Sequence, residues 1–172
     1  CSQSRGLGDV YKRQALKELR SLGFTTAHIA PDQGIFRGQT GVISLSDQLN
    51  PINSSVAQVI DFKYRAKKNR EYPRSLLGVI AHIRQTFYDS DWYLKAQEIV
   101  QEYTSENEPI SSNSSLESLG LSRALNKPFV FISSNDNSSS RAINIVKEFK
   151  LSPWILGSGY EYRVLDLSLI HI

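Results

Sequence analysis

The last third of the chain alternates short apolar runs with an amphipathic helical pattern, and this alternation most constrains the fold. Pro128–Ile132 reads PFVFI, which is typical of a buried strand, and Pro153–Leu156 begins a second strand. Between them, Arg141–Lys150 predicts a helix whose inward face consists of Ala142, Ile145, Val146 and Phe149. Strands that alternate with helices of this length imply right-handed crossovers and a parallel sheet, either open or closed as a barrel.

The first third contains a similar unit, GFTTAHIAPDQGIFRGQ at Gly23–Gln39. Ala15–Leu22 predicts the last turns of a helix, which Gly23 ends. Phe24–Ala30 is bounded by Gly23 and Pro31, and its small and β-branched residues favour a strand buried on both faces. The Gly-rich segment after this strand is expected to be a loop, and loops after buried strands often carry functional residues.

Two further apolar runs follow, Val42–Leu45 and Val56–Tyr64 (VAQVIDFKY). Ser46–Ser55 lies between them and has the Asp, Asn, Pro and Ser content of a turn. Two interpretations remain open here. The runs are either two excursion strands or one barrel strand with a preceding lip.

The middle of the chain predicts helices. Arg74–Tyr88 is expected to bury one face, formed by Leu76, Val79, Ile80, Ile83 and Phe87. Asp89–Asp91 predicts a cap, after which a second helix is expected to bury a stripe formed by Trp92, Ala96, Ile99, Val100 and Tyr103. Leu116–Leu125 predicts a weaker helix, after a polar connection at Ser105–Ser115.

Composition narrows the class of protein. The 172 residues are 40% hydrophobic, which suits one core-bearing domain or part of a larger one. The net charge of +3 is spread along the chain, and the basic run Lys63–Arg74 is typical of a solvated loop, so we expect no nucleic-acid partner. No apolar run is long enough to span a membrane, and we expect a soluble protein, cytoplasmic or periplasmic. The single cysteine, Cys1, does not choose between compartments, and composition leaves the oligomeric state open.

The two ends of the chain differ from the rest. Cys1–Gln14 and Val164–Ile172 resemble translated sequencing-adapter read-through, and neither carries a period, cap or turn signal that ties it to its neighbours. We therefore expect residues 15–163 to be the domain, and both ends to be non-native tails.

The carboxyl ends of the predicted strands give the candidate site, because ligands of parallel α/β folds gather there. The substrate-pocket candidates are His28, Asp32, Arg37, Ser133, Asn135, Gly157 and Glu161. For His28 two roles remain open, a structural hydrogen-bonding histidine and a pocket residue.

Three stretches together resemble the amidohydrolase superfamily in its imidazolonepropionase-like branch. They are GFTTAHIAPDQGIFRGQ, RSLLGVIAHIRQTFYDSDWY and the pair AINIVKEFKL with ILGSGYEYR. The resemblance implies an α/β fold that is part of a bacterial (β/α)8 TIM-type barrel, roughly its second to sixth strands. It also implies hydrolysis of C–N bonds in a small-molecule substrate, a cyclic amide or a dipeptide-like compound, with a divalent metal, commonly zinc.

The resemblance further implies metal ligands: a His-x-His pair on the first barrel strand, one histidine each on the fifth and sixth, and an aspartate on the eighth. We expect this chain to begin after the first strand and to stop before the eighth. The fifth and sixth strands correspond to the segments near Phe131–Ser133 and Gly157, and neither holds a histidine. We therefore expect no metal ligand and no catalytic residue in this chain, and no activity from it alone.

Two other functions are weighed against this one. The first is a non-catalytic, metal-free relative of the barrel that binds a small molecule or a partner. The second is a nucleotide-binding domain, which is weaker because no GxGxxG or GxxxxGK motif follows a predicted strand.

Overall fold

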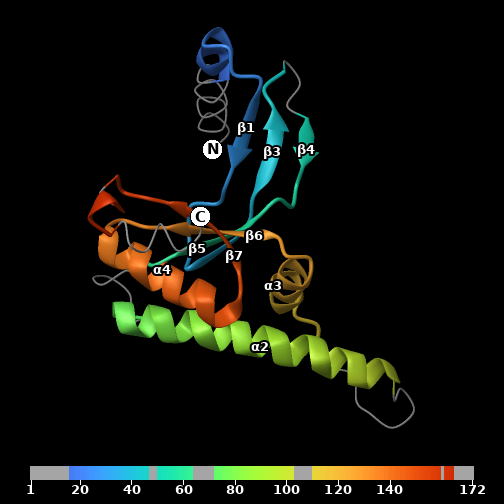
Figure 1. Cartoon of the computed structure of the whole chain (residues 1–172). Helices are drawn as coiled ribbons and strands as arrows, with labels where there is room; N and C mark the ends of the chain where they lie inside the picture. The colour runs from blue at the N-terminus through green and yellow to red at the C-terminus, as the bar shows by residue number, and fades with distance from the viewer. Residues whose placement is uncertain (1–15, 47–49, 64–71, 103–109, 160, 165–172) are drawn as a thin grey trace, which may run out of the picture.

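A computed structural model describes residues 16–46, 50–63, 72–102, 110–159 and 161–164 (Figure 1). A short helix at residues 16–21 precedes the labelled elements. In chain order these are β1 (Thr26–Ile29), β2 (Phe36–Gln39), β3 (Gly41–Ser44), β4 (Pro51–Asn53), β5 (Gln58–Asp61), α2 (Leu76–Glu102), α3 (Ser114–Ala124), β6 (Pro128–Ile132), α4 (Asp136–Phe149), β7 (Ser152–Leu156) and η1 (Glu161–Val164).

The described strands form two sheets. Sheet A has the order β1-β3-β4 and is antiparallel, with Thr26 opposite Ser44 and Val42 opposite Asn53. Sheet B has the order β2-β5-β6-β7. Strands β5, β6 and β7 are parallel, whereas β2 runs antiparallel to β5.

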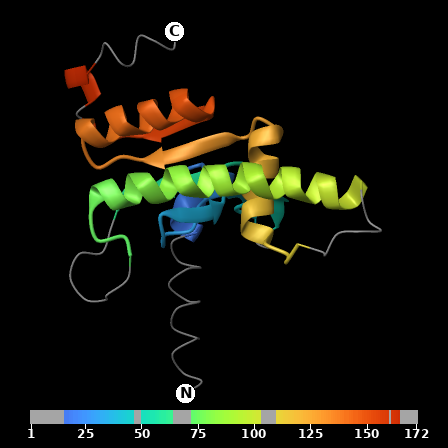
Figure 2. The same cartoon turned by 90° about the horizontal axis from the view of Figure 1, so that it is seen from below.

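The hydrophobic core lies between sheet B and the helices. Phe129 and Phe131 of β6 and Ile60 of β5 are buried against residues from α2 and α4. The ring of Phe87 in α2 lies 5.7 Å from that of Phe129 and 4.7 Å from that of Phe149 in α4. Figure 1 shows α2 and α4 on one side of sheet B and sheet A on the other. Among the described residues, helices therefore cover one face of the parallel strands, and Figure 2 views α2 from the side away from the sheet.

The first strand differs from its prediction. β1 is part of an antiparallel sheet, and three of its four residues are exposed rather than buried on both faces. The predicted loop after it contains β2, which pairs with β5. Gly34 and Gly38 take positive φ angles of 94° and 100°, so glycine allows a short strand to form inside a Gly-rich segment. The expectation of a purely parallel sheet is therefore wrong, and β2 and sheet A are the exceptions.

The two apolar runs after β2 belong to different sheets. β3 pairs with β1 and β4 in sheet A, whereas all four residues of β5 are buried at the centre of sheet B. Both runs therefore form strands, and the described strands of the two sheets close no barrel.

α2 is one continuous helix of 27 residues, so the predicted cap at Asp89–Asp91 is wrong. Its buried face continues from Phe87 through Ser90 to Tyr93, and the Ser90 hydroxyl donates to the Leu116 carbonyl oxygen at 3.0 Å. Because Ser90 is polar, the apolar pattern in the sequence is interrupted here although the buried face of the helix continues. As a consequence Trp92 and Ile99 are exposed, contrary to the predicted core stripe, and Tyr103 lies outside the described residues.

The other helices and strands agree with their predictions, apart from the start of α4. Residues 16–21 are helical, and Gly23 donates its backbone N–H to the Arg20 carbonyl oxygen at 2.9 Å, as expected of a helix end. α3, β6 and β7 form where predicted, and the predicted inward residues of α4 are buried. α4 begins at Asp136, five residues before the predicted start at Arg141, because Asn135 caps it. Within the described ranges no helix combines the length and apolar character needed to cross a membrane. The predicted tails lie outside the described residues except for Val164.

Candidate functional site

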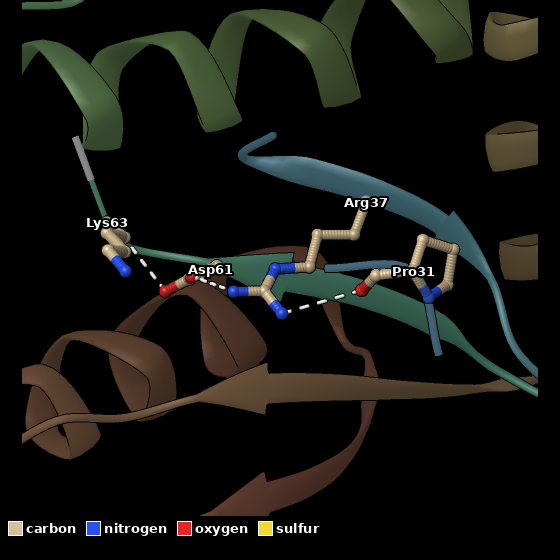
Figure 3. A network of polar contacts seen from close by, with 4 residues as sticks. All are labelled: Pro31, Arg37, Asp61 and Lys63. Atoms are coloured by element: carbon tan, nitrogen blue, oxygen red, sulfur yellow. Dashed lines mark hydrogen bonds and ion pairs between the residues drawn. The ribbon is translucent and has the colours of Figure 1, made fainter. Parts of the chain in front are cut away.

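An ion pair between Arg37 and Asp61 lies where β2 meets the carboxyl end of β5 (Figure 3). Asp61 is the last residue of β5, and its side chain points away from the helices because the preceding Ile60 is in the core. The side chains of Arg37 and Asp61 are 15% and 8% exposed. A second guanidinium nitrogen of Arg37 donates to the Pro31 carbonyl oxygen at 3.4 Å, so Arg37 also contacts the beginning of the β1–β2 connection.

The carboxylate of Asp61 is fully engaged. Its Oδ2 accepts from Arg37, and its Oδ1 accepts from the backbone N–H of Lys63 at 3.0 Å. The Nε of Arg37 is buried, and it has no hydrogen-bond partner among the described residues. This site therefore presents a neutralised pair with one remaining donor.

A second polar group involves His28 of β1. Its Nε2 lies 2.7 Å from the Thr40 hydroxyl oxygen, and its ring meets that of Trp154 edge-on with the centroids 6.1 Å apart. Thr40 in turn accepts from the backbone N–H of Ala57, just before β5. His28 thus connects sheet A to the helix-free face of sheet B, the face that bears Trp154.

Ser133 and Asn135 follow β6 and form the beginning of α4. The Asn135 side-chain oxygen accepts from the Ser138 backbone N–H at 2.9 Å, the geometry of an N-cap. The Ser133 hydroxyl donates to the Asn135 carbonyl oxygen at 2.7 Å and accepts from the hydroxyl of Ser139 at 2.8 Å. The polar atoms of Ser133 and Asn135 thus form hydrogen bonds at the N-terminus of α4.

The remaining candidates do not join either group through a described contact. Asp32 is exposed in the connection before β2, and Gly157 follows β7 at its carboxyl end. The backbone of Glu161 begins η1, and its side chain lies outside the description. The structure places Arg37 beside Asp61, which the sequence analysis misses. An aspartate that closes the buried run VIDF is the signal that could have found it.

The described residues do not fit a divalent metal. No three His, Cys, Asp or Glu side chains converge in the described ranges. At the carboxyl end of β5, the carboxylate oxygens of Asp61 already accept hydrogen bonds from the Arg37 guanidinium and the Lys63 backbone N–H. A cation would have to displace Arg37, so no chemical step through a metal follows from these residues.

Surface depressions in the described part of the chain have volumes of about 270 to 420 Å³. The one of about 420 Å³ runs along the free edge of β2, beside α2 and α3. Its polar lining includes Gln58, whose amide nitrogen donates to the hydroxyls of Ser118 and Ser122 at 3.1 and 3.2 Å. None of the predicted pocket residues lines it.

Comparison with known proteins gives a likeness of fold. No family model matches the chain, and no curated protein matches it. Among solved structures, the chain is similar to an amidohydrolase from Thermotoga maritima MSB8 with a TM-score of 0.66 and 20% sequence identity. The match covers 77% of this chain and 36% of that one, so the chain spans about a third of the solved amidohydrolase. Most of the described chain therefore has the fold of a part of that amidohydrolase.

Proposed function

We propose that this chain forms one wall of a (β/α) barrel hydrolase of the amidohydrolase kind. The whole protein would hydrolyse a C–N bond of a small cyclic amide or dipeptide-like substrate, as proteins of the imidazolonepropionase-like branch do. The metal of such an enzyme, commonly zinc, would be held by residues other than those described. The chain by itself would be inactive.

The observation that carries this proposal is the face of sheet B opposite the helices, which is buried at β5 but exposed at β7. Parallel strands are usually covered on both faces. Here α2 and α4 cover one face, while on the other Trp154 and Leu156 of β7 are 47% and 60% exposed. β2 and β7 are also the outer strands of sheet B, each with one edge unpaired by any described strand. A barrel would cover that face and pair both edges, and the likeness to part of an amidohydrolase supports this interpretation.

The Arg37–Asp61 pair would then lie near the carboxyl-end rim of the barrel, where barrel enzymes bind their substrates. Its charges cancel, and its position is fixed by the Pro31 carbonyl oxygen and the Lys63 N–H. In this proposal the pair is a positioning element that keeps the strand ends in register. The buried Nε of Arg37 has no hydrogen-bond acceptor among the described residues.

The test is to express the chain with its native flanking sequence and to measure metal content by mass spectrometry, together with hydrolysis of a panel of cyclic amides and dipeptides. We expect bound zinc, manganese or iron, hydrolysis that a chelator abolishes and added metal restores, and no hydrolysis by the 172-residue chain alone. The 172-residue chain is the matched control, because it contains every residue described here.

A flanked protein without bound metal, with no hydrolysis, and with a melting temperature that added metal does not change would contradict the enzyme proposal. If that protein still bound a member of the panel, the non-catalytic, metal-free barrel relative would replace it.

A further inference from the structure

We draw no further inference here: the strongest candidate, the hollow of about 420 Å³ along the free edge of β2 beside α2 and α3, lies on a strand edge that the proposed barrel would itself pair, and the side-chain amide nitrogen of Gln58 in its lining already donates to the hydroxyls of Ser118 and Ser122.

Discussion

At the scale of single residues, Arg37 and Asp61 show how local sequence and tertiary position combine. Arg37 is expected to be a solvated loop charge or a substrate contact, and it proves to be a strand residue paired with Asp61. Removing water from two charges is costly, and only their mutual attraction and further hydrogen bonds offset that cost. The pair therefore depends on both partners being present.

Asp61→Asn is expected to destabilise the chain by about 3 to 5 kcal/mol, because it leaves the buried Arg37 guanidinium without its counter-charge. The double variant Arg37→Met with Asp61→Leu should lose less, since no unpaired charge remains. Urea denaturation followed by circular dichroism measures both changes in the free energy of unfolding.

The control for this prediction is the ion pair of Arg84 with Glu148, which joins α2 to α4 at the surface, with side chains 44% and 30% exposed. Because solvent screens such a pair, Glu148→Gln should change stability by less than about 1 kcal/mol. A loss as large as that of Asp61→Asn would show that burial does not govern the energies of these pairs.

At the scale of elements, the hydrogen bonds at the ends of α4 come from neighbouring residues in the sequence. α4 begins at Asp136 because the preceding Asn135 caps it, and it ends at Lys150, whose positive φ of 52° stops the helix. Helix caps act through neighbours three or four residues away, so local sequence specifies them. The inward face of α2 beyond Phe87 depends instead on what packs against it.

Asn135→Ala is expected to destabilise the chain by about 1 kcal/mol, because the backbone N–H of Ser138 loses its acceptor. Asn137→Ala is the matched control. It lies two residues further on, is exposed, and has no side-chain hydrogen bond among the described contacts, and alanine is the better helix former. Thermal melts of the two variants should therefore differ, with only Asn135→Ala lowering the midpoint. Equal midpoints would mean that the cap contributes nothing to stability.

At the scale of the whole molecule, sheet B is the unusual feature. Its parallel strands are buried from one side by α2 and α4, while the exposure of its other face increases from β5 to β7. His28 of sheet A contacts Trp154 on that face. The exposure of Trp154 therefore reports whether the face is covered.

Acrylamide quenching of Trp154 fluorescence tests whether this face is covered. The measurement uses a Trp92→Phe background, in which Trp154 is the remaining tryptophan of the 172 residues. In the 172-residue chain we expect strong quenching, because the indole is about half exposed. In the protein with its native flanks the quenching constant should fall severalfold, since further barrel strands would cover the indole. Equal quenching in both would contradict the barrel proposal.

The sequence by itself determined which segments become helices and strands in the last third of the chain, since buried apolar runs and a 3.6-residue period are local properties. It also determined the helix stop at Gly23, whereas the start of α4 lies five residues before its predicted position. Only the tertiary structure decided the pairing of β2 with β5, the partner of Asp61, and the side of α2 that faces the core. These depend on residues far apart in sequence, and α2 offers two apolar sides between which its own sequence cannot choose.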